Sequence, residues 1–152
     1  MRYLFGVAVL AVFFVSCKDD DLYGINSDTR TYILADKKWQ ISSIFVKTTR
    51  GVIIRDEFTL LPDYRKDDYL FFRADSTFEL NDNTLKDPLT TSLVIAKGKW
   101  RLEQGEQILR LFPESGVVPG DSLRIADIDA STFTVEKPAP EGVQAYGFRA
   151  VP

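Results

Sequence analysis

Short runs of apolar and β-branched residues, each bounded by turn-forming residues, recur along the chain from about residue 38 to the end. Within these runs apolar and polar residues partly alternate, which is the pattern of a strand with one face against a core. The clearest case is 69–81, where Ala74-Asp75-Ser76 forms a tight turn between two strands. Asp75 can accept a hydrogen bond from the backbone N–H two residues later, and Phe78 and Leu80 lie on one face of the second strand. The predicted strands cover 38–47, 69–73, 77–81, 92–102, 107–112, 121–128, 131–136 and 146–151, with a short extended piece at 52–54.

No segment shows a long helical period, so the pattern predicts an all-β protein, an antiparallel meander of about eight strands that closes into a barrel. Closure removes the edges of the sheet, and the interior of an eight-stranded barrel is filled by side chains or holds one small ligand. An open β-sandwich is the alternative, and the sequence alone does not distinguish the two. Outside the strands, one helical turn is predicted at 31–34 and a crossing loop at 58–68.

Ahead of the strands, the N-terminus has the features of an export signal. Met1-Arg2 is followed by an apolar run from Tyr3 to Val15, and then by Cys17 and a charged segment. An apolar run of roughly 14 residues falls short of the ~20 that cross a bilayer as a helix. It suits the apolar part of a secretory signal peptide. We therefore expect residues 1–16 to be removed on export.

The end of this segment resembles the bacterial lipoprotein signal, in which an apolar residue and two small or medium residues precede an acceptor cysteine. Here those positions are Phe14, Val15, Ser16 and Cys17. The resemblance implies that Cys17, the only cysteine in the chain, carries acyl groups such as palmitate after cleavage. Several acyl chains hold a protein on a membrane far more firmly than one chain does. The expected partner of the mature N-terminus is therefore a membrane.

The residues after Cys17 form an acidic linker, which we expect to extend over 17–30. Lys18-Asp19-Asp20-Asp21 resembles the acidic tag that routes some lipoproteins of Gram-negative bacteria to the outer face of the outer membrane. An acidic run also suits a solvated tether, because like charges repel and do not pack. The expected location is the cell envelope, with the protein lipid-anchored at the outer membrane and facing the cell exterior.

The composition fits one globular domain over 31–152. The chain has 152 residues, a hydrophobic fraction of 45%, and eleven Phe, six Tyr and two Trp, which is ample for a core. Its formal net charge is −3 and no basic cluster is longer than two residues, so nucleic-acid binding is not expected. With a single cysteine, the exported domain depends on its core and its hydrogen-bonded sheet rather than on an internal disulfide.

The order of the predicted strands is similar to that of the small lipocalin-like domains of bacterial cell-envelope lipoproteins. The resemblance implies a lipocalin-like barrel over most of 34–150. Many such domains have no assigned function, so the resemblance bears on the fold and not on the ligand. The segments that carry it are 36–41 (DKKWQI), 67–78 (DDYLFFRADSTF), 98–102 (GKWRL) and 109–111 (LRL).

Six aromatic side chains would project into the barrel if the predicted registers hold. They either line an apolar pocket for a hydrophobic molecule or form the core. A barrel this small needs most of its interior filled, which favours the core. The six residues are Trp39, Phe45, Phe71, Phe78, Trp100 and Phe112.

The chain contains no histidine, which removes the commonest general base and the commonest metal ligand. Its serines stand in no recognisable nucleophile motif, so we expect neither an enzyme nor a bound cofactor. Asp67-Asp68 and Asp82-Asn83 offer oxygen ligands, but the alternating acids of a calcium loop are missing. We interpret these residues as parts of solvated loops and expect no metal site.

The sequence therefore favours a non-catalytic lipoprotein whose barrel binds an apolar or amphipathic small molecule. This hypothesis predicts a cavity beneath Trp39 and Trp100. The alternative is an interaction module in a cell-surface assembly that acquires glycans or peptides. That module would use exposed aromatic residues on loops, such as Tyr64 and Tyr146.

Overall fold

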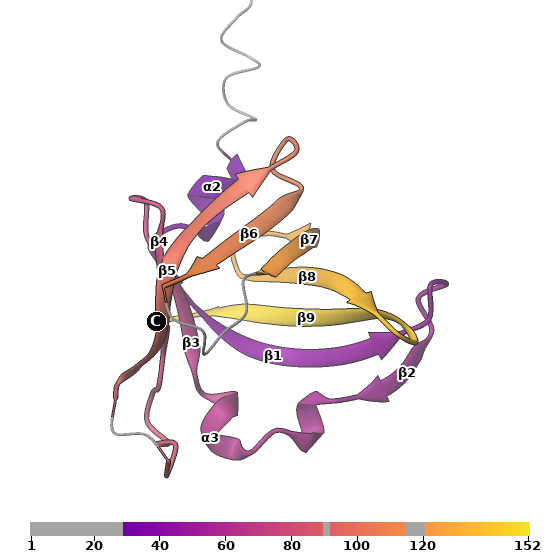
Figure 1. Ribbon diagram of the computed structural model, residues 1–152, viewed down its shortest axis with the longest axis horizontal. Coiled ribbons are helices and arrows are strands. Elements are labelled where there is room, and N and C mark those ends of the chain that lie inside the picture. Colours follow the sequence, from indigo (N-terminus) through magenta and orange to yellow (C-terminus); the bar gives the residue numbers. More distant parts are fainter. Residues whose placement is uncertain (1–28, 90–91, 115–120) are drawn as a thin grey trace, which may run out of the picture.

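Nine antiparallel strands form one sheet, and eight of them close into a barrel (Figure 1). The computed structural model describes residues 29–89, 92–114 and 121–152. The predicted signal peptide, Cys17 and most of the acidic linker lie outside these residues. The strands are β1 (Lys37–Lys47), β2 (Ile53–Asp56), β3 (Tyr69–Phe72), β4 (Thr77–Asn81), β5 (Val94–Glu103), β6 (Ile108–Pro113), β7 (Asp121–Ile128), β8 (Thr132–Ala139) and β9 (Gly142–Val151).

The barrel closes because β1 pairs with the last strand as well as with β3. The β1–β9 ladder runs from Lys38 opposite Val151 to Lys47 opposite Val143. Each remaining barrel strand pairs with its neighbour in sequence, from β3 through β9. The all-β antiparallel barrel is confirmed, and the open sandwich is ruled out. The extra strand, β2, lies beside the C-terminal half of β1 and pairs with no other strand.

The β3–β4 hairpin has the predicted turn. The Oδ1 atom of Asp75 accepts a hydrogen bond from the backbone N–H of Thr77 at 2.9 Å. Phe72 pairs with Phe78 and Leu70 with Leu80, which places these apolar side chains on the inner face.

β8 and β9 are longer than predicted, because Pro138 does not end β8. It stands opposite Val143 in the β8–β9 ladder. The β7–β8 ladder ends at Glu136, so the missing N–H of Pro138 interrupts no pairing on that side.

Short helices cover the two ends of the barrel. The predicted helical turn lies in α2 (Thr29–Leu34), and the predicted crossing loop contains η1 (Phe58–Leu60) and α3 (Asp63–Lys66). α2 and α3 lie at opposite ends (Figure 1). Among the described residues, no helix is long and apolar enough to span a bilayer.

α2 seals its end of the barrel with both polar and apolar contacts. The carboxylate of Glu106 accepts hydrogen bonds from the Arg30 N–H at 3.2 Å and from the Thr31 hydroxyl at 2.9 Å. Leu34 is completely buried, and its carbonyl oxygen accepts a hydrogen bond from Trp39 Nε1 at 2.9 Å. The helix is thus held to the β5–β6 turn and to β1.

The core fills the half of the barrel next to α2. Trp39 packs edge-on against Phe133 with ring centroids 4.8 Å apart, and Phe72 does so against Trp100 at 5.3 Å. Such edge-to-face pairs add to the free energy gained from burial. The buried core comprises Leu34, Trp39, Phe72, Phe78, Trp100, Leu109, Leu111, Leu123, Ile125, Phe133 and Val135.

Candidate functional site

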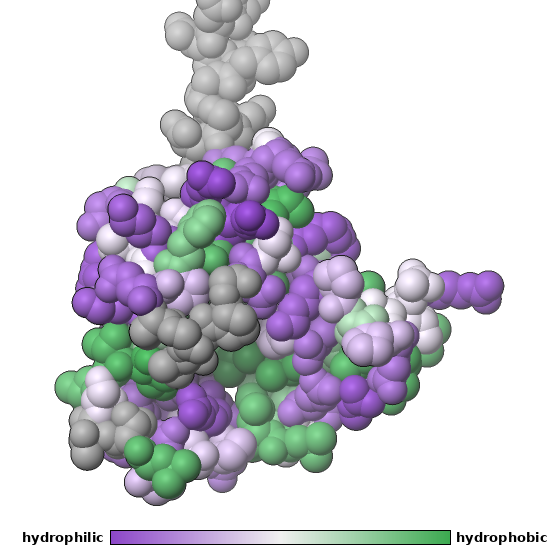
Figure 2. Space-filling model, viewed as in Figure 1, coloured by the Kyte–Doolittle hydropathy of each residue, from purple (hydrophilic) through white to green (hydrophobic). Residues whose placement is uncertain are grey.

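A cavity of about 550 Å³ lies in the other half of the barrel, where α3 and the residues that flank it contribute to its wall. This volume lies within the range of small-molecule sites. In the space-filling view, apolar residues gather around a hollow in the lower half of the molecule (Figure 2). The apolar lining consists of Trp39, Ile41, Ile44, Leu61, Pro62, Leu70, Phe78, Leu80, Leu111, Leu123, Val135 and Phe148.

The difference between the two halves follows from the size of the inward side chains. Near α2 the inward positions hold Trp39, Phe72, Trp100 and Phe133, whose rings meet across the interior. Towards α3 the inward positions hold aliphatic residues such as Leu80. Because Ile, Leu and Val reach less far across a barrel of fixed diameter, they leave the centre empty.

Three of the six predicted aromatic residues point inward as expected. Trp39 and Phe78 line the cavity at its inner end. Trp100 is buried in the core but does not contact the cavity, and its Nε1 donates to the carbonyl oxygen of Arg73 at 3.0 Å. The predicted cavity therefore lies against Trp39 and not against Trp100.

For Phe45, Phe71 and Phe112 the predicted inward orientation is wrong. In β1 the register shifts between Ile41 and Ser43, so Ile44 faces the cavity and Phe45 faces outward. A shift of one residue moves the following side chains to the opposite face.

The other two aromatic residues alternate with inward neighbours. Phe71 stands opposite Glu79 on the outer face, with the Arg73 guanidinium 5.2 Å from its ring centroid. Phe112 is 41% exposed and lies between the guanidinium groups of Arg101 and Arg110, at 5.0 and 5.9 Å. The rings of Phe71 and Phe112 therefore contact guanidinium groups on the outer face and do not enter the barrel.

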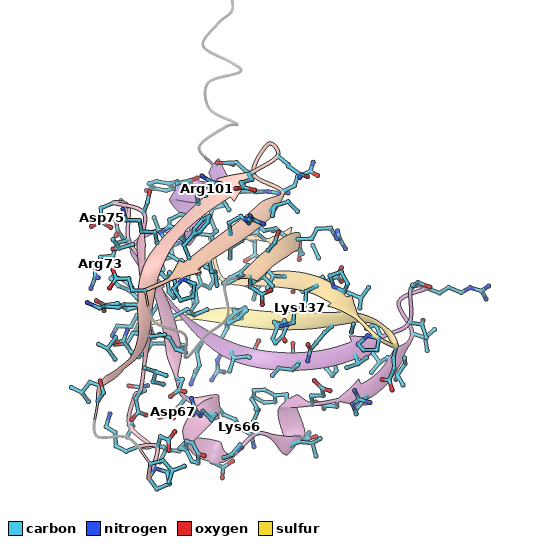
Figure 3. All side chains as sticks on the ribbon, viewed as in Figure 1. Lys66, Asp67, Arg73, Asp75, Arg101 and Lys137 are labelled. Carbon is cyan, nitrogen blue, oxygen red and sulfur yellow. The ribbon has the colours of Figure 1, made fainter. Side chains whose placement is uncertain are left out.

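The first polar group of the cavity wall lies on β7, β8 and β9. Lys137 Nζ is 3.2 Å from Asp121 Oδ2, and the Tyr146 hydroxyl donates to Gln144 Oε1 at 2.7 Å. Burial lowers the pKa of Lys137, but its hydrogen bond with Tyr146 and the charge of Asp121 more than offset this, so the net shift is upward. The charge of Lys137 is therefore compensated by that of Asp121. Figure 3 labels Lys137, which belongs to β8.

The second polar group lies on the opposite wall, at α3 and the start of β3. Arg65 Nη2 is 2.9 Å from Asp87 Oδ2, and Arg65 Nη1 is 3.9 Å from Asp68 Oδ2. The Asp68 side chain is only 7% exposed, and its Oδ1 atom has no hydrogen-bond partner in the described part of the chain. Figure 3 labels Lys66 and Asp67, which stand between Arg65 and Asp68 in the sequence.

Burial raises the pKa of Asp68 to about 6. The positive charge of Arg65 opposes this shift, and the negative charges of Asp82, Asp67 and Asp87 add to it. The carboxyl group is thus surrounded by more acids than bases.

The interpretation of these acids as solvated loop residues is wrong for Asp68 and Asp82. The Asp82 side chain is 1% exposed, neither of its carboxylate oxygens has a hydrogen-bond partner among the described residues, and Lys86 Nζ is 3.9 Å away. Asp67 Oδ2 accepts hydrogen bonds from the backbone N–H groups of Thr84 and Leu85, both at 2.9 Å. Within 29–89, 92–114 and 121–152, no three acid or cysteine side chains are arranged to hold a metal ion.

Tyr64 and Tyr146 do not lie as the alternative hypothesis requires. Tyr64 belongs to α3 and Tyr146 to β9, and both are partly buried and line the cavity. They contribute polar atoms to its wall rather than an exposed aromatic surface.

Comparison with known proteins gives no independent assignment: no family model and no curated protein matches this sequence.

Proposed function

We propose that this protein is a non-catalytic, membrane-anchored lipoprotein of the lipocalin-like kind, whose barrel binds an apolar or amphipathic small molecule. The observation that carries the proposal is the cavity of about 550 Å³ with apolar walls. Among the residues that the structure describes, the polar side chains of its wall are Tyr64, Arg65, Asp68, Asp121, Lys137 and Tyr146. Apolar surface gains about 25 cal/mol per Å² when it leaves water, so an apolar ligand is favoured in this space.

The composition supports a binding role rather than catalysis. The chain has no histidine, and the charged groups of the cavity are joined in ion pairs: Lys137 with Asp121, and Arg65 with Asp87. Ion pairs of this kind fix these side chains and compensate their charge.

The sequence supports a lipid anchor on Cys17, because this residue stands between an apolar run and an acidic segment. The linker leads into α2, which lies at the end of the barrel opposite α3, and α3 contributes to the cavity wall. Mass spectrometry of the protein from cell membranes should find residues 1–16 removed and acyl groups on Cys17. A full-length chain with an unmodified thiol would contradict the anchor.

The two tryptophans allow a direct test of binding, because Trp39 lines the cavity and Trp100 does not. The barrel, α2 and the core are complete within 29–152. The test therefore uses residues 17–152 with Cys17→Ser, without detergent. The ligand is 11-bromoundecanol, whose bromine quenches an indole that it contacts.

In the Trp100→Phe variant, Trp39 is the single indole, and we expect saturable quenching. In the matched Trp39→Phe variant, Trp100 remains, and we expect little quenching. Near-ultraviolet circular dichroism checks that both variants are folded. No quenching in either variant, or equal quenching in both, would count against binding in this cavity.

One observation favours the second candidate function, an interaction module of a cell-surface assembly that acquires glycans or peptides. Four leucines are exposed in the described part of the chain: Leu60 in η1, and Leu85, Leu89 and Leu93 in the segment between β4 and β5, of which Leu89 is 91% exposed. Single exposed leucines are common, but several near one another suggest a contact surface. Pull-down of the lipidated protein from membranes should then recover a stoichiometric partner, and replacement of Leu60, Leu85, Leu89 and Leu93 by Ser should abolish the recovery.

A further inference from the structure

Asp68 is a buried carboxylate at the cavity wall with an unmet hydrogen-bonding demand. Its side chain is more than nine-tenths buried, and its Oδ1 atom has no partner within the described residues. Nearly all buried polar atoms in proteins have a partner, because an unpaired one keeps the full cost of its desolvation. A donor is therefore expected to reach this carboxylate from outside the described structure.

Arg65 does not meet this demand. Its Nη2 atom lies 2.9 Å from Asp87 Oδ2, which fixes the guanidinium against that carboxylate. The distance from its Nη1 atom to Asp68 Oδ2 is 3.9 Å, which is an ion pair but too long for a hydrogen bond.

The surroundings of Asp68 carry an excess of negative charge. The four carboxylates of Asp67, Asp68, Asp82 and Asp87 face two cations, Arg65 and Lys86, which leaves two negative charges. Lys86 Nζ donates to the backbone carbonyl oxygens of Asp82 and Asn83. This wall therefore attracts a cation and repels an anion.

The opposite wall, with Lys137 and Asp121, presents no uncompensated charge to a ligand. Lys137 Nζ is 3.2 Å from Asp121 Oδ2, so the charge of each compensates the other. A carboxylate ligand would have to displace Asp121 from Lys137, whereas an ammonium group would meet the Asp68 carboxylate, which Arg65 approaches only to 3.9 Å.

We propose that the ligand of the cavity is an apolar molecule that ends in a protonated amine, and that its ammonium group donates a hydrogen bond to Asp68. The hydrocarbon part then lies along the apolar wall that begins beside Asp68, where Leu70 and Leu80 pair across β3 and β4. This inference rests on the proposed function and names the chemistry of its ligand.

Three ligands with the same hydrocarbon chain test the inference: decylamine, decanol and decanoate. Each displaces the neutral fluorescent probe N-phenyl-1-naphthylamine from residues 17–152 with Cys17→Ser at neutral pH. A hydrogen bond between two charged groups favours the amine by about tenfold or more over the alcohol. The expected order of affinity is decylamine, then decanol, then decanoate.

Variants assign the preference to Asp68. In Asp68→Asn, decylamine should lose its advantage of about tenfold, while decanol should bind within about threefold of its original affinity. The matched control is Asp63→Asn, which removes the same charge from an exposed position on α3 and should keep the preference. In Asp121→Asn, Lys137 loses its counter-ion, so decanoate should gain affinity and decylamine should not lose any.

The outcomes separate this inference from the function on which it rests. If decanol binds as tightly as decylamine, or decanoate binds most tightly, the amine is wrong while binding of an apolar molecule stands. If Asp63→Asn abolishes the preference as Asp68→Asn does, recognition by Asp68 is wrong. If neither the probe nor any of the three ligands binds, the proposed function fails as well.

Discussion

Asp68 Oδ2 lies 3.9 Å from Arg65 Nη1, so the two residues form an ion pair without a hydrogen bond at the wall of the cavity. Arg65 is 39% exposed and its shorter contact is with Asp87, so it compensates only part of the charge of the more deeply buried Asp68. Without a bound ligand, the ionised form of Asp68 therefore costs free energy.

This cost predicts that the contribution of Asp68 to stability falls as the pH rises from about 4 to about 6. The pKa of Asp68 is about 6 in the folded protein against an ordinary 3.8. In that window the folded state binds the proton and the unfolded state releases it, so the contribution of Asp68 to stability decreases with increasing pH and the loss is complete above the folded pKa.

Asp68→Asn should remove this pH dependence, because the amide stays neutral. With allowance for screening by solvent, we expect the variant to be more stable than the wild type by about 1–2 kcal/mol near pH 7.5. Near pH 4 the two should be similar. Urea unfolding at both pH values measures the difference, and Asp63→Asn is the control. A variant that is less stable than the wild type near pH 7.5 would contradict the assignment.

Trp39 should stabilise both the packing of α2 on the barrel and the core. In Trp39→Phe the carbonyl oxygen of Leu34 loses the hydrogen bond from the indole, and a small void forms beside Phe133. We expect a loss of about 2–3 kcal/mol in the free energy of unfolding. Trp100→Phe should cost a similar amount, because its indole also bonds to a backbone carbonyl.

The two tryptophan variants should differ in where the structure opens. Hydrogen exchange of the α2 amides should accelerate in Trp39→Phe and stay unchanged in Trp100→Phe. Equal acceleration in both variants would show that α2 does not depend on the contact with Trp39.

Glu106 should hold α2 on the barrel. Glu106→Ala removes the acceptor of the Arg30 N–H and of the Thr31 hydroxyl, and we expect a loss of about 1–2 kcal/mol together with faster exchange in α2. The control is Glu103→Ala, which removes only surface ion pairs with Arg101 and Arg110 and should cost less than about 0.5 kcal/mol. The role of Glu106 would be wrong if the two variants cost the same.

The alternation of residues predicted the barrel well because each strand has one face in the core. The inward orientation of Trp39, Phe78 and Trp100 follows from their neighbours in sequence alone, and the turn at Asp75 follows from its side-chain chemistry. The error at Phe45 has a different origin. The irregularity between Ile41 and Ser43 depends on how β1 meets β9, and no residue in β1 signals it.

The polar part of the candidate site could not be predicted from local sequence. Asp68 and Asp82 are separated by a whole hairpin strand pair and are buried only because the loop after β4 folds back over α3. A short acidic pair normally indicates solvent exposure. The pairing of Arg65 with Asp87 across 22 residues is a property of the tertiary fold.

Gly98 should be essential to the contact between β5 and β6. A Cβ atom at this position would lie 2.2 Å from the carbonyl oxygen of Phe112 and 2.7 Å from the Cα of Pro113, and both are backbone atoms that move only with β6. We therefore expect Gly98→Ala to destabilise the protein by about 3 kcal/mol. Gly105→Ala is the matched control, since its φ of +65° disfavours Ala but no atom lies within 4 Å of the added Cβ, so the loss should be about 1 kcal/mol. Urea unfolding of both variants decides the matter: if Gly98→Ala costs no more than Gly105→Ala, the close approach of β5 and β6 is not as tight as these distances require.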